Sequence, residues 1–153
     1  MQPLNLPPIT AKIIVRDEKQ SIFDPIRRRY VALTPEEWVR QHFVSFLIHQ
    51  RGVPLGLIGN EVSLTVGTTT KRCDTVIYNR MSLPIVIVEY KAPHVAITQS
   101  VFDQIARYNT ALHVEWLIVS NGLRHICCHI DYATRTSQFV ADIPSWSEMA
   151  REN

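Results

Sequence analysis

Hydrophobic positions at helical spacing predict a first helix over residues 35–50. Phe43 and Leu47 lie four positions apart, with further apolar residues one turn before and beside them, so they share one face of a helix. Thr34 is a suitable N-cap, a proline follows at the first helical position, and Glu37 completes the pattern of a capping box. The segment RGVPLG, with two glycines and a proline, ends the helix.

Three strands are predicted downstream of this helix. The segment LIGNEVSLTV alternates between apolar and polar residues, and the following GTTTK predicts a turn. Residues 73–78 and 85–91 are mostly apolar and are separated only by NRMSLP. This connection is short enough for an antiparallel hairpin.

A second helix and a further strand follow the hairpin. The segment TQSVFDQIARYNTAL carries an apolar stripe that includes Phe102 and Ile105, and the short apolar run WLIVSNG comes after it. A strand, a helix and a strand at this spacing form a βαβ crossover, so residues 85–91 and 116–120 are expected to pair in parallel. RHICCHIDY and SQFVADI predict a terminal hairpin. Together these elements predict an α/β fold with a mixed central sheet and a helix on each side of it.

Length and composition are those of one soluble globular domain. The 153 residues are enough for a single core, and 46% of them are apolar and 20% charged. The proline-rich start has no regular pattern, so we expect residues 1–21 to form an extended arm and residues 22–153 to form the domain. Three cysteines without a disulfide framework, and no pattern of a secretory signal or a membrane span, predict a cytoplasmic protein.

The net charge of +2 is too small to indicate a nucleic-acid partner by itself. The basic residues are unevenly placed, however, with Arg27, Arg28 and Arg29 in one run and Lys71 and Arg72 in another. Such runs predict either a basic face or a merely solvated one.

Three charged residues lie within or beside the two predicted hairpin strands. Glu89 and Lys91 are two positions apart and therefore point to the same face, and Asp74 begins the neighbouring strand. Two carboxylates and the backbone carbonyl of Tyr90 at one edge form an oxygen-rich site of the kind that Mg²⁺ or Mn²⁺ prefers. A lysine beside it can hold a phosphate oxygen or a water molecule, which favours phosphodiester hydrolysis. The alternative is an exposed Glu-x-Lys pair at a strand end without a function.

The predicted second helix adds two polar residues. Gln104 and Tyr108 lie four positions apart and therefore on one helix face. Near a carboxylate site they could orient a water molecule or contact a phosphate. The alternative is a partly exposed polar edge of an amphipathic helix.

These residues form a series along the chain: Asp74, then Glu89-Tyr90-Lys91, then Gln104 and Tyr108. The series resembles the Asp…Glu-x-Lys…Gln-x-x-x-Tyr pattern of the PD-(D/E)xK nuclease superfamily. Within that superfamily, the segments FDPIRRRYVALTPEEWVRQHF, VEYKAPHVAITQSVFDQIARYN and VSNGLRHICCHIDY are similar to the N-terminal nuclease domain of type I restriction enzyme R subunits. The similarity covers residues 22–145.

The resemblance implies a restriction-endonuclease-like core and metal-dependent cleavage of DNA. Asp74, Glu89 and the Tyr90 carbonyl would bind the metal ion, and Lys91 would stabilise charge or orient water. The Gln-x-x-x-Tyr pair would support them. The expected cofactor is Mg²⁺ or Mn²⁺.

Such nucleases often add a glutamate from the first helix, and Glu36 and Glu37 are available. Glu37 is the predicted catalytic residue of the two, although it also has an explanation as part of the helix cap. The chain departs from the family in having Cys73, rather than a proline, before Asp74. It also has neither the helicase-like motor of R subunits nor a Gly-x-x-x-x-Gly-Lys phosphate loop, so ATP-driven translocation is not expected.

DNA is the expected partner, and docking onto a separate restriction or repair complex is the alternative to the homodimer described next. One site cuts one strand, so we also expect a homodimer that presents two sites to the two strands. The rival function is a non-catalytic DNA-binding or scaffolding module of the same fold in a restriction or repair complex. The intact set of Asp74, Glu89 and Lys91 favours the enzyme.

Two other groups of residues have both a functional and a structural interpretation. In HICCH, His125, Cys127 and His129 share one face of a strand, but no Cys-x-x-Cys partner for zinc exists elsewhere in the chain. Buried cysteines and half-exposed histidines are therefore expected. Trp38 and Trp116 could stack on bases, but their apolar surroundings in the sequence favour packing in the core or at its edge.

Overall fold

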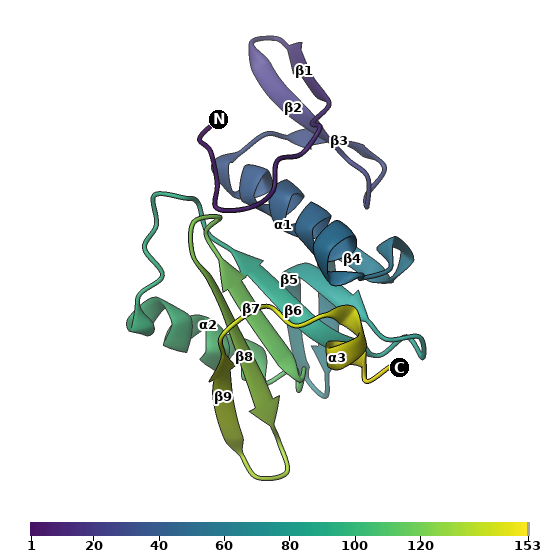
Figure 1. Ribbon diagram of the computed structural model, residues 1–153, viewed down its shortest axis with the longest axis vertical. Helices are drawn as coiled ribbons and strands as arrows, with labels where there is room; N and C mark the ends of the chain where they lie inside the picture. Colours follow the sequence, from purple (N-terminus) through teal and green to yellow (C-terminus); the bar gives the residue numbers. More distant parts are fainter. Residues whose placement is uncertain (153) are drawn as a thin grey trace.

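The computed structural model describes residues 1–152 and contains two β-sheets (Figure 1). The strands are β1 (Ile13–Arg16), β2 (Lys19–Asp24), β3 (Arg29–Ala32), β4 (Ile58–Val66), β5 (Thr69–Tyr78), β6 (Pro84–Tyr90), β7 (Trp116–Ser120), β8 (His125–Asp131) and β9 (Thr136–Val140). The helices are α1 (Pro35–Arg51), the short 3-10 helix η1 (Leu55–Leu57), α2 (Gln99–Thr110) and α3 (Trp146–Ala150).

The larger sheet has six strands in the order β4-β5-β6-β7-β8-β9. Its neighbouring strands are antiparallel except for β6 and β7, which pair in parallel and are connected through α2. The predicted central hairpin, crossover and terminal hairpin are therefore confirmed. The fold is the mixed α/β arrangement that the sequence predicts.

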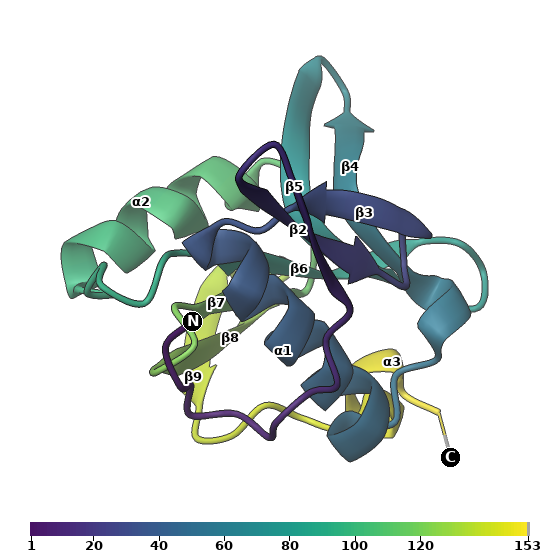
Figure 2. The ribbon, with the colours of Figure 1, turned by 90° about the horizontal axis from the view of Figure 1, so that it is seen from above.

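Helices α1 and α2 cover opposite faces of the larger sheet (Figure 2). Strand β6 shows this division, because its side chains alternate between the two faces. Val88 packs in the same core as Phe43 of α1, whereas Ile87 packs in the same core as Phe102 of α2. A strand that is apolar on both faces belongs at the centre of such a sheet. No helix within residues 1–152 is long and apolar enough to cross a membrane.

The N-terminal region differs in part from the expected extended arm. Residues 13–21 form β1 and the first half of β2, in a three-stranded antiparallel sheet with β3. Asp17 and Glu18 make the turn between β1 and β2, with φ angles of 50° and 64°, as in the tight turns that suit hairpins. The dipeptide Asp-Glu lacks the Asn-Gly or Asp-Gly pattern of such turns, so the sequence gives little indication of this hairpin.

Residues 1–12 have no helix or strand and lie against the rest of the domain. The indole N–H of Trp38 donates to the Gln2 carbonyl at 2.9 Å, and the Asn5 N–H donates to the Gly122 carbonyl at 2.8 Å. The half-buried Trp38 therefore packs under the N-terminal segment, which agrees with the structural interpretation of that residue. The half-buried Trp116 packs at the edge of the core on the α1 side, as expected.

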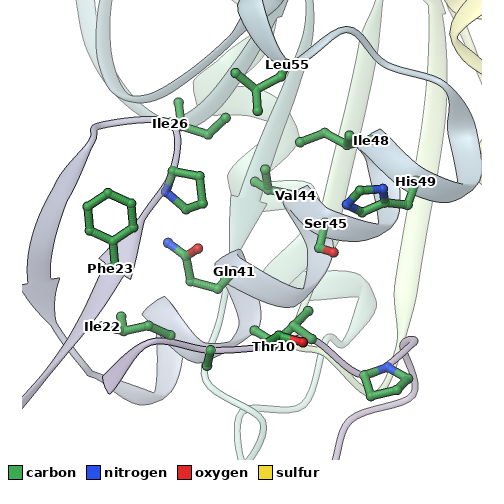
Figure 3. A pocket seen from close by; sticks show the side chains of 14 residues that line it. Thr10, Ile22, Phe23, Ile26, Gln41, Val44, Ser45, Ile48, His49 and Leu55 are labelled. Atoms are coloured by element: carbon green, nitrogen blue, oxygen red, sulfur yellow. The ribbon is translucent and has the colours of Figure 1, made fainter. Parts of the chain in front are cut away.

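A cavity of about 430 Å³ lies between residues 8–11, β2 and α1 (Figure 3). Its wall is mostly apolar and includes Ile22, Val44 and Ile48, while Gln41 contributes an amide group. It shares no residue with the candidate active site described below.

The segment HICCH forms most of β8, and its two cysteines point to opposite faces of the larger sheet. Cys127 packs in the core on the α1 side and Cys128 in the core on the α2 side. Both cysteines are buried, whereas His125 and His129 are half-buried. The expected buried cysteines and half-exposed histidines are confirmed.

Asp24, at the end of β2, connects the small sheet to β4 of the larger sheet. Its side chain is fully buried and accepts hydrogen bonds from the Arg27 guanidinium, from the Ile26 N–H and, at 3.2 Å, from Asn60 Nδ2 on β4. Burial alone would raise the pKa of Asp24, but these donors outweigh it and hold the pKa below its usual value. The carboxylate is therefore ionised and fully bonded between the two sheets.

Replacing Asp24 with alanine should lower the free energy of unfolding by about 2–4 kcal/mol, because Arg27 would lose one of its two carboxylate partners and the buried Asn60 amide would lose its acceptor. Urea unfolding measures this change, and limited proteolysis should show faster cleavage within residues 13–32. The exposed Asp142→Ala serves as the matched control and should change stability by less than about 0.5 kcal/mol. Equal stability of the two variants would show that the hydrogen bonds of Asp24 do not stabilise the position of the small sheet.

Candidate active site

Six of the seven predicted functional residues line one open cavity of about 460 Å³ between the larger sheet, α1 and α2. Those that line it are Asp74 of β5, Glu89 and Tyr90 of β6, Lys91, and Gln104 and Tyr108 of α2. Glu36 of α1 and Lys71 of β5 also line the cavity. Residues that are distant in the sequence therefore meet in one place.

Asp74 is positioned by an interruption of regular strand pairing. The ladder between β5 and β6 includes the pair of Thr75 and Val88, and no pair is formed between Asp74 and Glu89. Instead, Oδ2 of Asp74 accepts a hydrogen bond of 2.9 Å from the Tyr90 N–H. The side chain thus replaces a backbone acceptor, which brings the Asp74 carboxylate to the end of β6.

Glu89 is only 8% exposed and lies beside Asp74. Burial raises the pKa of Glu89, and the adjacent Asp74 carboxyl raises it further, to about 8, although Lys71 acts in the opposite direction. Two neighbouring carboxylates resist ionising together unless a cation lies with them. This pair therefore has the charge and the oxygen donors of a cation site.

Tyr90 presents its backbone, and not its ring, to the cavity. Its phenol is 3% exposed, packs in the core on the α1 side and donates to Thr75 Oγ1 at 2.9 Å. This orientation agrees with the alternation along β6, in which Tyr90 faces away from Glu89.

Lys71 is a member of the site that the motif pattern does not include. Its Nζ donates to Glu89 Oε1 at 2.8 Å and to Asn109 Oδ1 at 3.0 Å. It also lies 4.4 Å from the centre of the Tyr108 ring. In the sequence, Lys71 looks like part of a basic surface run, and only the extension of β5 back to Thr69 would place it on a strand.

The two α2 residues of the motif are exposed. Tyr108 is 61% exposed and packs its ring against the Lys71 ammonium, while Gln104 lines the same side of the cavity. Their four-residue spacing therefore places both at the cavity, on the exposed polar edge of α2.

Glu37, the predicted catalytic glutamate, does not line the cavity, and this prediction is corrected. Glu37 is 5% exposed, and its carboxylate accepts from Arg27 Nη2 at 2.7 Å and from Gln41 Nε2 at 2.9 Å. Its Oε2 also lies 3.2 Å from Arg40 Nε. The preceding residue, Glu36, is exposed and lines the cavity instead.

The capping box is only half formed for the same reason. Thr34 Oγ1 accepts from the Glu37 N–H at 3.0 Å, as expected of an N-cap. The Glu37 carboxylate does not return to the Thr34 N–H, which instead donates to the Ala32 carbonyl. The half-buried Arg27, the buried Arg40 and the Gln41 amide hold the carboxylate away from the cap.

The donors that are present suit a hard divalent cation with an incomplete protein shell. Among residues 1–152, no group of three or more His, Cys, Asp or Glu side chains is close enough to hold a metal ion. Mg²⁺ commonly uses only one or two carboxylates, with water and substrate phosphate oxygens as its other ligands. The adjacent Asp74 and Glu89 fit this pattern, and the Tyr90 backbone lies beside them.

The chain is an α/β domain with a mixed six-stranded sheet, and charged residues line a cavity beside the central strands of this sheet. Residues 35–144 match the family model described as the N terminus of type I restriction enzyme R proteins, and the chain belongs to this family. A search of curated proteins gave no match.

A solved structure supports the fold. The chain is similar to a fragment described as an HsdR subunit of a type I restriction enzyme from Vibrio vulnificus YJ016, with a TM-score of 0.56 and 21% sequence identity. The match covers 78% of this chain and 25% of that one. The chain therefore spans about a quarter of the length of that relative.

Substitution of the two neighbouring glutamates of α1 should distinguish the buried structural residue, Glu37, from the exposed residue that lines the cavity, Glu36. Glu37→Gln should lower the free energy of unfolding by about 1–3 kcal/mol, since Arg27 and Arg40 would each lose one of their two carboxylate partners. Glu36→Gln, at an exposed position, should change it by less than about 0.5 kcal/mol. Chemical denaturation of both variants measures the difference, and a reversed order of stability would contradict the placement of these residues.

Proposed function

We propose that this domain hydrolyses DNA phosphodiester bonds with Mg²⁺ or Mn²⁺ at the site formed by Asp74 and Glu89. The observation that carries the proposal is the convergence of Asp74, Glu89 and Lys91 with two α2 residues in one open cavity. Membership in the family of type I restriction R subunit N termini supports DNA as the substrate. The order and spacing of these residues support the further assignment to the PD-(D/E)xK nucleases.

The residues of the chain have distinct parts in this reaction. Asp74, Glu89 and the Tyr90 carbonyl would hold the metal ion. When bound, the ion would lower the pKa of a water molecule and neutralise charge that develops on the phosphate. Lys91 has no salt bridge among the described residues, so its ammonium is available to orient the water or to bind a phosphate oxygen.

The α2 residues and Glu36 would act at the rim of the cavity. The Gln104 amide and the Tyr108 hydroxyl are exposed, and both can donate hydrogen bonds to a phosphate oxygen. Glu36 adds a third carboxylate at the start of α1, where it can accept a hydrogen bond from water.

The proposed partners follow from the same family. Type I R subunits belong to restriction complexes, so this domain would work on DNA beside other subunits of such a complex. Because one site cuts one strand, a homodimer would provide the second site for a duplex break. We also propose that the domain acts in the cytoplasm.

The second candidate is a module of the same fold that binds DNA or a restriction complex without cleaving DNA. The Lys71–Glu89 ion pair favours this alternative, because it already neutralises one of the two acids. Cleavage assays distinguish the two functions directly.

The purified domain should cleave DNA in Mg²⁺ or Mn²⁺ and lose this activity in EDTA. Supercoiled, linear, branched and single-stranded DNA should be compared in order to determine which form of the substrate is preferred. Asp74→Ala and Lys91→Ala should each lower the cleavage rate by on the order of 100-fold or more. Asp103→Ala, on α2 but outside this cavity, is the control and should retain the wild-type rate.

Circular dichroism should confirm that the variants remain folded. Cleavage at the wild-type rate by both Asp74→Ala and Lys91→Ala would overturn the assignment of the site. Tight DNA binding without cleavage under all of these conditions would favour the non-catalytic module.

A further inference from the structure

Lys71 has three contacts that fix its ammonium inside the candidate site. It donates to Glu89 Oε1 at 2.8 Å and to Asn109 Oδ1 at 3.0 Å, and it lies 4.4 Å from the centre of the Tyr108 ring. The side chains of Lys71 and Glu89 are only 13% and 11% exposed. This ion pair is therefore well shielded from water, in contrast to most lysine pairs on protein surfaces.

We propose that Lys71 is a built-in competitor of the divalent ion: its ammonium holds Glu89 in the metal-free domain and gives up that carboxylate when the ion binds. This proposal rests on the proposed metal-dependent function. It goes further by assigning a role to a residue outside the motif series.

The competition follows from the number of cations that one acid pair can hold. Asp74 and Glu89 provide two carboxyl groups, and Lys71 already occupies one oxygen of Glu89. A divalent ion bound to the same carboxylate would lie within a few ångströms of the ammonium, where two positive charges repel strongly in a shielded site. Binding of the ion therefore weakens the contact of Lys71 with Glu89.

The displaced ammonium has other partners in place. Asn109 is 3% exposed and is itself fixed by a hydrogen bond of 2.9 Å from its Nδ2 to the Ile105 carbonyl. Its Oδ1 therefore remains in position as an acceptor, and the Tyr108 ring remains beside it as a cation–π partner. Lys71 can thus stay in the cavity after it leaves Glu89.

The exchange would change the charge of the cavity in the direction that DNA requires. A bound divalent ion brings two positive charges into a cavity that already holds the ammonium groups of Lys71 and Lys91. The acidic groups of the same cavity are Asp74, Glu89 and, at the rim, Glu36. The site would therefore attract a phosphodiester anion most strongly once the ion is bound.

Calorimetric titration of the DNA-free protein with Mn²⁺ tests this proposal without any cleavage step. Lys71→Gln removes the charge but keeps a polar side chain that can donate a hydrogen bond. It should bind Mn²⁺ on the order of tenfold more tightly than the wild type. Lys71→Arg keeps the charge and should bind Mn²⁺ with nearly the wild-type affinity.

Two further variants locate the effect. Arg72→Gln removes one positive charge from the same strand but outside the cavity, and it should stay within about threefold of the wild type, because exposed charges are screened. Asp74→Asn in the wild-type and Lys71→Gln backgrounds should abolish the Mn²⁺ signal, which places the ion at this site.

An affinity of Lys71→Gln that equals or falls below that of the wild type would overturn the proposal while leaving the metal-dependent function intact. Binding by Lys71→Gln alone, with none by the wild type, would support strong competition. If no protein, including Lys71→Gln, binds Mn²⁺ at millimolar concentration, both this proposal and the metal dependence of the proposed function fail.

Discussion

The hydrogen bond from the Tyr90 N–H to the Asp74 carboxylate determines the geometry of the whole site. Regular pairing between β5 and β6 stops just before these residues, and the Asp74 side chain continues it. This places Asp74, in the middle of β5, beside the buried Glu89 near the end of β6. The site is therefore a consequence of how two central strands are joined, and not of a flexible loop.

A buried network of charges holds this junction from the α1 side. Arg40, 6% exposed, donates to the Asp74 carbonyl and pairs with Glu61 at 2.6 Å and with Glu37. Glu37 in turn pairs with Arg27, which also contacts Asp24 of the small sheet. The N-terminal sheet, the first helix and the strand that carries Asp74 are thus connected through successive ion pairs. Since buried pairs are costly to break, this network favours a fixed position for Asp74.

The sequence predicts those parts of the fold that have a regular period. Helix α1, the β5–β6 hairpin and the parallel pairing of β6 with β7 follow from apolar spacing and connection length. The motif series contains three residues that line the same cavity, Asp74, Glu89 and Lys91. The β1–β2 hairpin is missed because its turn uses Asp17 and Glu18, without a glycine or asparagine that favours positive φ.

The sequence also fails to predict that Glu36 rather than Glu37 lines the cavity, and that Lys71 belongs to the site. Both features depend on tertiary geometry and not on a turn sequence. Glu36 and Glu37 are adjacent on α1, and only the rotation of the helix against the sheet decides which one faces the cavity. Lys71 is three positions from Asp74, so in a regular strand the two side chains would point to opposite faces. The irregular geometry where β5 passes Asp74 allows both to line one cavity, and no periodic pattern in the sequence indicates such an irregularity.

The most direct test of the central claim is a crystal structure of the domain with Mn²⁺, examined by anomalous scattering. We expect one anomalous peak in direct contact with both Asp74 and Glu89, with metal–oxygen distances of roughly 2.0–2.3 Å. The absence of a peak between these carboxylates at a saturating Mn²⁺ concentration, or a peak only at the histidines of β8, would contradict a metal-dependent site at the end of β6.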